Sequence, residues 1–298
     1  MDKTELENYL KAGEINKKAQ KKAKEVLQLG ANLLDAVEEI EASILKNNGK
    51  LAFPVNLSVN EIAAHFTPPS NCVQSIEDND LIKVDIGVHV EGFIADAAFS
   101  IAFNKKHEKL IQASENALEA GVKKFKAEIE LKEIGKVIQK EINSMGFNPI
   151  QNLSGHGLGK GVVHAPPTIP NIENNDDRAI EDNSAYAIEP FATDGRGYVR
   201  EGIQTEILQL EKVKPIRNMH ARKILEFIEE EYEFYPFALR QLEKGIKMQE
   251  FNLKIGLKEL RQKELLKAYP ILKEEEGKIV SQAETSLVLF EGKVHRLV

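Results

Sequence analysis

The sequence contains very little cysteine. Of its 298 residues only Cys72 is a cysteine. A single cysteine excludes a disulfide within the chain and a thiolate-rich metal site, and it is typical of a reducing compartment. We expect Cys72 itself to be a small buried apolar residue.

The chain also lacks a net positive charge and long hydrophobic runs. Its net charge of -7 and pI near 5.7 disfavour a protein whose whole surface meets nucleic acid. No segment approaches the roughly 18 to 20 apolar residues that span a bilayer. The first segment, "MDKTELENYLKAGEINKKAQKKAKE", has no apolar stretch behind a basic start and so predicts no secretory signal. We therefore expect a soluble, cytoplasmic protein with no membrane partner.

Periodicity in the first half of the chain predicts both helices and strands. Apolar spacing predicts two helices over residues 4–46 with a break near Gly30, and two more over 107–126 and 131–145. Residues 81–103 alternate and predict two strands joined by a tight turn near Val90 and Glu91. Two strands followed by two helices favour an α+β fold.

The second half has a helical block between strands. Residues 185–193, the segment "EILQLEKVK" and the C-terminal "GKIVSQAETSLVLFEGKVHRLV" have strand character. Residues 218–269 show helical periodicity instead. This order predicts a helical insertion into a sheet domain.

Two histidines flank a glycine-rich stretch, "LSGHGLGKGVVHAPP", at residues 153–167. His156 and His164 are eight residues apart, so they do not form the helical zinc motif, whose histidines are four apart. The glycines disfavour a helix, and we expect a strand end or loop where backbone can approach a ligand. On this stretch alone, two surface histidines are an equally good interpretation.

Two aspartates lie among apolar residues of the predicted hairpin. With the turn centred on Val90 and Glu91, Asp85 and Asp96 would stand directly opposite, with Cβ atoms about 4.5 to 5.5 Å apart. Like charges repel at that distance, so we expect a divalent cation between them. The alternative is a pair of aspartates on a solvent-facing edge.

Two glutamates, Glu189 and Glu284, are likewise embedded in apolar strand-like segments. A buried carboxylate is costly unless it is paired, protonated or metal-bound, although each alone could also be an edge-strand residue. Together with the two aspartates and His156 they form a set large enough for two metals. Such ligands suit manganese, iron, cobalt or zinc better than copper.

These motifs resemble the methionine aminopeptidases of type II. The resemblance spans nearly the whole chain and rests on the stretches "LAFPVNLSVNEIAAHFTPP", "VDIGVHVEGFIADAA", "NLSGHGLG", "VHAPPTIPN", "AIEPFAT" and "SQAET". It implies the α+β pita-bread fold with a winged-helix-like helical insertion. The catalytic domain would comprise residues 1–213 and 270–298, and the insertion residues 214–269.

The resemblance implies a metal role for five residues. Asp85 would bind one metal, and His156 and Glu189 the other. Asp96 and Glu284 would bridge the pair. The cofactors would be two divalent ions, with cobalt, manganese, iron, zinc and nickel as candidates.

The same resemblance implies which residues meet the substrate. His65 and His164 would contact it, and with Glu189 they would form the catalytic set. In that set Glu189 accepts a proton from water and His164 donates to the scissile amide. Phe53 and Val163 would help to line the pocket for the methionine side chain.

The implied activity is removal of the initiator methionine from nascent polypeptides by dinuclear-metal-assisted hydrolysis, with preference for a small second residue. The expected partners are nascent N-termini, with a contact to the ribosome left open, and the chain is expected to be a monomer. Residues 214–273 contain 13 lysines and arginines against 9 acidic residues, a net charge of +4. A nucleic-acid module is therefore an alternative for this part, although we expect no specific nucleic-acid partner.

Two other functions fit the same motifs. Xaa-Pro peptidases use the same five ligands, but they usually carry a large N-terminal domain, and the first ligand here is already at residue 85. A non-catalytic binding homologue on the same fold would normally have lost ligands, and none of the five is missing. One departure is Thr285, where the family usually has histidine after the last glutamate.

Overall fold

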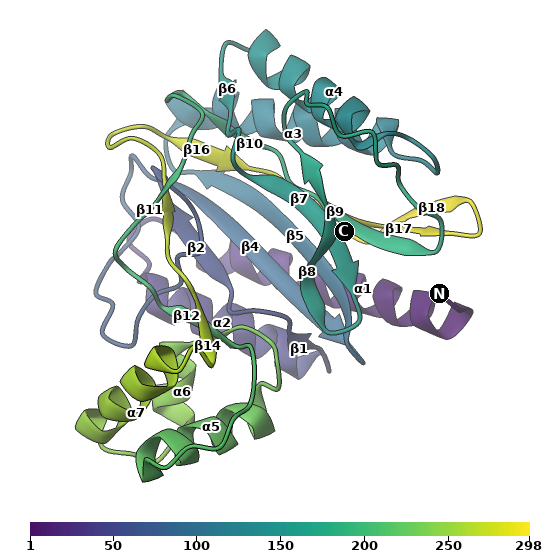
Figure 1. Ribbon diagram of the computed structural model, residues 1–298. Helices are drawn as coiled ribbons and strands as arrows, with labels where there is room; N and C mark the ends of the chain where they lie inside the picture. Colours follow the sequence, from purple (N-terminus) through teal and green to yellow (C-terminus); the bar gives the residue numbers. More distant parts are fainter.

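The computed structural model describes all residues from 1 to 298, with helices on the outside and strands between them (Figure 1). The α-helices are α1 (Lys3–Val26), α2 (Leu33–Lys46), α3 (Glu108–Lys124), α4 (Leu131–Ser144), α5 (Met219–Glu231), α6 (Leu239–Gly245) and α7 (Glu250–Gln262). The strands are β1 (Lys50–Leu51), β2 (Asn56–Val59), β3 (Ile62–Ala64), β4 (Leu81–Val90), β5 (Phe93–Ala102), β6 (Asn148–Pro149), β7 (Ser154–Gly159), β8 (Val162–Pro170), β9 (Ser184–Ile188), β10 (Phe191–Thr193), β11 (Arg200–Glu201), β12 (Ile207–Leu210), β13 (Phe237–Ala238), β14 (Leu266–Tyr269), β15 (Leu272–Lys273), β16 (Val280–Gln282), β17 (Thr285–Phe290) and β18 (Lys293–Arg296).

Two sheets form the centre of the molecule, and each is backed by a pair of helices (Figure 1). One sheet contains β1, β4 and β2, with β5 paired to β4, and shares a core with α1 and α2. The other has the strand order β18-β17-β9-β7-β8 and packs against α3 and α4. The predicted α+β class is therefore confirmed. No helix is both long enough and apolar enough to cross a membrane.

The four predicted helices of the first half are present. Helix α1 begins at a capping box between Asp2 and Glu5, and the Asn32 side chain caps α2. Gly30, with φ of 82°, lies in the break between these helices. Gly146 follows α4 with φ of 85°, which is the left-handed conformation of a helix stop.

The register of the β4–β5 hairpin differs from the predicted one. Its turn consists of Glu91 and Gly92, which both have positive φ (51° and 88°), as a type I′ turn requires. Asp96 is therefore paired with Gly87, and the prediction that it stands directly opposite Asp85 was wrong. The shift is two residues, so both aspartates still lie on one face of the sheet.

The block between residues 207 and 269 combines helices with a small sheet. Helices α5, α6 and α7 share a core with the sheet β13-β12-β14, shown in green at the lower left of Figure 1. The expectation of helix throughout residues 218–269 missed β13 and β14. These strands have two and four residues, too few for alternation to appear in the sequence. The division of the chain at residues 214 and 269 stays a prediction.

Cys72 departs from its expected place. Its side chain is only partly buried and lies at the edge of the core formed by α1, α2 and the β4 sheet. The prediction of a buried residue was therefore wrong. Its segment, residues 65–75, forms no helix or strand that would carry it inward.

A buried asparagine of α1 ties the hairpin together behind the aspartates. Asn16 is fully buried, and its Nδ2 donates to the carbonyl oxygens of Ile86 (2.6 Å) and Ala95 (3.1 Å). Ile86 directly follows Asp85, and Ala95 directly precedes Asp96. The side chain thus links both strands at the two positions that carry carboxylates.

Replacing Asn16 by leucine should lower the free energy of unfolding by about 1–3 kcal/mol, because buried polar groups lose a hydrogen-bond partner. Urea unfolding followed by circular dichroism measures the change. The exposed neighbour Lys17, replaced by alanine, is the control and should stay within about 0.5 kcal/mol of wild type. Equal stability of the two variants would contradict the stabilising link between the two strands through Asn16.

Candidate active site

One cavity of about 210 Å³ brings together every residue that the sequence indicated for the site. These nine side chains come from positions more than 200 residues apart. They are Phe53, His65, Asp85, Asp96, His156, Val163, His164, Glu189 and Glu284. The hairpins β4–β5 and β7–β8 supply five of them, and the two glutamates come from later segments.

The two glutamates lie at breaks between strands and not within strands as expected. Glu189 separates β9 from β10, and Glu284 separates β16 from β17. At both points the chain passes between the same two sheets, because β9 and β17 are paired in one sheet and β10 and β16 in another. The two glutamates thus occupy equivalent positions, each where the chain passes from one sheet to the other, and both side chains line the same cavity.

Asp96, His156 and Glu284 can offer ligand atoms that all lie within 4.8 Å of one another. The His156 Nε2 atom is 3.7 Å from the Asp96 carboxylate and 3.6 Å from that of Glu189. Asp85 lines the same cavity. The histidine is therefore surrounded by carboxylates, as in a site that binds a cation.

The four carboxylates carry strongly perturbed pKa values. Burial raises the pKa of Asp85 to about 7, although a hydrogen bond from Gln282 opposes the shift. Burial, and then the charge of Asp85, raises the pKa of Asp96 well above its usual range. Burial and the neighbouring carboxylates do the same to Glu189 and Glu284. Four buried carboxylates that disfavour one another's ionisation need a compensating positive charge.

No lysine or arginine lines the cavity to supply that charge. Lys83 is buried two residues before Asp85, but its Nζ donates to the Asn60 carbonyl oxygen (2.6 Å). One carboxylate oxygen of Asp85 and one of Asp96 are buried without any hydrogen-bond partner. These orphaned oxygens are suited to bind a metal ion.

The histidine is also prepared as a ligand. Burial lowers the pKa of His156 to about 4, so the ring is neutral at physiological pH, as metal binding requires. Its Nδ1 lies 3.0 Å from the Gly157 carbonyl oxygen, which leaves Nε2 free toward the carboxylates. The residues present therefore fit a divalent metal.

Two further histidines face the cavity. His65 has a positive φ of 65°, and its Nδ1 lies 3.2 Å from the Pro270 carbonyl oxygen. The His164 ring is 4.6 Å from that of His156, centroid to centroid, in an edge-on arrangement. Tyr269 packs edge-on against His65 and tilted against His164, so its ring holds the two together. Desolvation in the cavity lowers the pKa of both histidines and keeps them neutral.

Apolar side chains close the rest of the cavity. Phe53 and Val163 were expected there, but the sequence did not point to the following apolar residues: Phe191, Ile207, Pro236, Tyr269 and Leu272. The sheet β13-β12-β14 brings Ile207 opposite Ala238 on one side and Tyr269 on the other. The helical block therefore supplies part of the wall, and no local sequence signal marks these residues.

Polar residues behind the cavity hold its carboxylates in place. Gln282 donates from Nε2 to Glu284 (3.2 Å), and Asn171 donates to the Glu189 carbonyl oxygen (3.0 Å). The Ser286 hydroxyl donates to the Asp96 carbonyl oxygen (2.7 Å) and accepts from its amide (2.8 Å). Sequence analysis missed all three. Gln282 and Ser286 could have been found from the sequence, because each lies two residues from Glu284 and has a polar side chain in an otherwise apolar segment.

Thr285 does not line the cavity. Its hydroxyl donates to the Val298 carbonyl oxygen (2.7 Å), and its side chain is buried. The departure from the usual histidine thus leaves the nine cavity residues in place.

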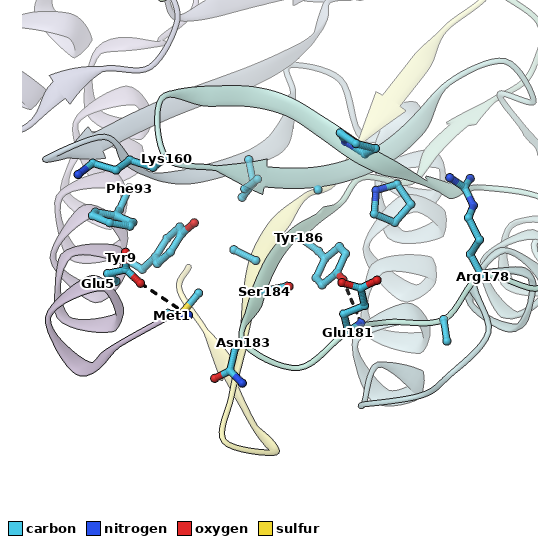
Figure 2. Close-up of a pocket in the computed structure, with 16 residues that line it drawn as sticks. Met1, Glu5, Tyr9, Phe93, Lys160, Arg178, Glu181, Asn183, Ser184 and Tyr186 are labelled. Carbon is cyan, nitrogen blue, oxygen red and sulfur yellow. Dashed lines mark hydrogen bonds and ion pairs between the residues drawn. The ribbon is translucent and has the colours of Figure 1, made fainter.

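A larger hollow of about 590 Å³ lies between the start of α1 and the loop before β9 (Figure 2). It contains none of the nine residues. Two of its polar side chains already serve the fold. The Tyr186 hydroxyl accepts from the Glu181 amide, and the Glu5 carboxylate is 3.8 Å from the Met1 amino nitrogen (Figure 2). The Glu5 carboxylate also caps α1. Size alone therefore does not identify the reactive site, and the smaller cavity has the convergent ligand groups.

Comparison with known proteins identifies the family of this chain. The sequence model of metallopeptidase family M24 matches residues 7–211. A methionine aminopeptidase of Pyrococcus horikoshii is 38% identical over 97% of this chain and 98% of its own length. One of Thermococcus onnurineus is 41% identical over 96% of each chain.

Solved structures share the fold at low sequence identity. A thermophilic Arx1 superposes with a TM-score of 0.87 at 15% identity, over 100% of this chain and 91% of that one. A methionine aminopeptidase of Thermotoga maritima gives 0.71 at 20% identity, over 100% and 97%. A prolidase of Pyrococcus furiosus gives 0.60 at 18% identity, over 99% of this chain but 64% of that one. The structural neighbours have the predicted pita-bread fold, and the family model matches more than half of the chain. The chain therefore belongs to metallopeptidase family M24.

Proposed function

We propose that this chain is a methionine aminopeptidase, which hydrolyses the peptide bond after the initiator methionine of a polypeptide and prefers a small second residue. The observation that carries the proposal is the identity of 37–41% to methionine aminopeptidases over nearly the full length of both chains. The substrates are accordingly the N-termini of nascent polypeptides.

Sequence identity favours the methionine aminopeptidases over the Xaa-Pro alternative. The methionine aminopeptidase relatives are 37–41% identical to this chain, whereas the solved prolidases and related dipeptidases are 14–18% identical. The non-catalytic alternative does not explain why four carboxylates that repel one another are held in one cavity. Likeness to Arx1 at 15% identity concerns the fold alone.

We assign the metal ligands as Asp85, Asp96, His156, Glu189 and Glu284, with Asp96 and Glu284 shared between two ions. A buried, partnerless oxygen on each of Asp85 and Asp96 and the neutral imidazole of His156 support the assignment. When bound, divalent ions would supply Lewis acidity and a water molecule of lowered pKa. Cobalt, manganese, iron, zinc and nickel are all compatible with these ligands.

Three residues then perform the proton transfers and the positioning. The Glu189 carboxylate accepts the proton of the attacking water, and its side chain is partly accessible from the cavity. Neutral His164 donates through its ring N–H to the scissile amide or to the developing oxyanion. His65, held by the Pro270 carbonyl group, contacts the substrate beside it.

The apolar wall binds the methionine side chain. Phe53 and Val163 are almost fully buried, and together with Phe191 and Leu272 they give the cavity an apolar wall. An unbranched thioether fits such an irregular apolar site. We also infer a cytoplasmic, monomeric enzyme without a specific nucleic-acid partner, and a ribosome contact is left to experiment.

Removal of metal should abolish methionine release. The purified protein is stripped with a chelator and restored separately with cobalt, manganese, iron, zinc or nickel. Hydrolysis of Met-Gly-Met-Met is then compared with that of an Xaa-Pro peptide. We expect metal-dependent release of methionine and no Xaa-Pro cleavage. Xaa-Pro cleavage would assign the chain to the proline peptidases, and no turnover with any metal would favour the binding homologue.

Asp96→Asn should stabilise the metal-free protein while abolishing activity. One of four mutually repelling carboxylates becomes neutral, so the thermal midpoint should rise by roughly 1–2 °C, the shift that about 1 kcal/mol gives in a chain of this size. Manganese should no longer raise the midpoint. Differential scanning calorimetry with and without metal measures both effects, and Asp78→Asn in an exposed loop is the control. A lower thermal midpoint of metal-free Asp96→Asn than of metal-free wild type would contradict repulsion among the four carboxylates.

His164→Ala should lower kcat by roughly 10²-fold, the contribution expected of a general acid, while metal content stays near that of wild type. Peptide hydrolysis and elemental analysis provide the two measurements. Loss of bound metal would instead make His164 a ligand.

A further inference from the structure

The helical block is fastened beside the cavity by a buried ion pair. Arg240 of α6 is only 4% exposed, and its guanidinium is paired with the Glu41 carboxylate of α2. The same guanidinium donates to the Thr67 hydroxyl (2.6 Å) and to the Pro68 carbonyl oxygen (3.3 Å). Gln241, the next residue of α6, also donates to Glu41 (3.1 Å).

Two of the three acceptors of Arg240, Glu41 and Thr67, are hydrogen-bonded to the backbone of a single residue, Val55. The Glu41 carboxylate accepts from the Val55 amide (3.1 Å), and the Thr67 hydroxyl donates to the Val55 carbonyl oxygen (2.8 Å). Arg240 therefore closes a ring of hydrogen bonds around Val55. All members of the ring are buried, so each lost bond leaves a polar group without water.

Val55 lies between two residues of the cavity wall. Phe53 and Asn56 both line the cavity, and Asn56 is paired with Asp85 across the sheet. The Phe53 ring fits closely on Gly87, where an added Cβ would come within 2.2 Å of it. A small movement of the Val55 backbone would therefore displace the ring.

Arg240 also fixes the opposite side of the cavity. Pro236, which lines the cavity, precedes Arg240 by four residues, and β13 connects the two. Strand β13 in turn pairs Ala238 with the cavity residue Ile207. One side chain thus joins the wall formed before β2 to the wall formed by the helical block.

We propose that Arg240 is a positioning residue that sets the shape of the methionine side-chain pocket through the hydrogen-bonded ring around Val55. This role rests on the proposed methionine aminopeptidase function. Arg240 does not touch the cavity, so it acts on substrate binding through Phe53, Asn56 and Pro236 and leaves the metal ligands unchanged.

The test compares Arg240→Met with a matched control. Lys244 joins the same two helices through Glu38 (3.2 Å), but this pair is solvent-exposed and does not reach Val55. Arg240→Met should raise KM for a methionyl peptide by about ten-fold with kcat within about two-fold, the signature of lost ground-state and transition-state binding. Lys244→Met should change neither constant.

Two further measurements separate positioning from general stability. Preference for methionine over leucine at the first position, taken as the ratio of kcat/KM values, should fall about ten-fold in Arg240→Met, because the pocket wall loosens. Amide exchange of residues 52–58 should accelerate about ten-fold, while that of α4 stays unchanged. Metal content and folding at the assay temperature are checked for every variant.

Thr67→Val keeps the test decisive if Arg240→Met does not fold. It preserves side-chain shape but removes the hydroxyl that links Arg240 to Val55, and it should raise KM in the same direction by a smaller factor. A folded variant with reduced kcat but wild-type KM, selectivity and exchange would overturn the proposal. If wild-type protein releases no methionine, the proposed function fails. The exchange rates then decide alone: faster exchange of residues 52–58 supports the positioning role, and unchanged exchange overturns it.

Discussion

Mutual repulsion among four buried carboxylates is the constraint on which the rest of this structure depends. Each carboxylate is costly in an apolar interior, and together they raise one another's pKa. A fold can hold them if they are protonated or bind a cation, and if the backbone behind each group is fixed. Asn16 behind the hairpin and Ser286 against Asp96 meet the second requirement. Membership of a metallopeptidase family agrees with the first.

The two crossings between sheets explain why glutamates can take part. At Glu189 and at Glu284 the chain leaves one sheet and enters another, so the residue between the strands belongs to neither ladder. Its side chain can then point into the space between the sheets. The helical block closes that space from the side, and the buried pair of Arg240 and Glu41 holds it there. The carboxylates of the cavity and the part of its apolar wall that the helical block supplies thus come from different parts of the fold.

Local patterns predicted most of the elements, and together with the family resemblance they indicated nine of the residues that line the cavity. Apolar spacing located α1 to α4, and the motif around His156 correctly excluded a helix. Failures occurred where the pattern was short or where turn chemistry decided the outcome. The hairpin shifted by two residues because Gly92 takes the second position of its turn. The strands β13 and β14 were too short to alternate, and Cys72 lies in a loop at the edge of the core.

The sequence by itself determined nine residues that meet at one cavity, because carboxylates among apolar residues are costly unless they are paired, protonated or metal-bound, and because the family resemblance is specific. Only the tertiary structure decided how these residues meet. Gln282, Asn171, Tyr269 and Arg240 acquire their roles through contacts with residues from 2 to 204 positions away. Such contacts leave little periodicity or spacing in the chain, since they form between elements that only the complete fold brings together.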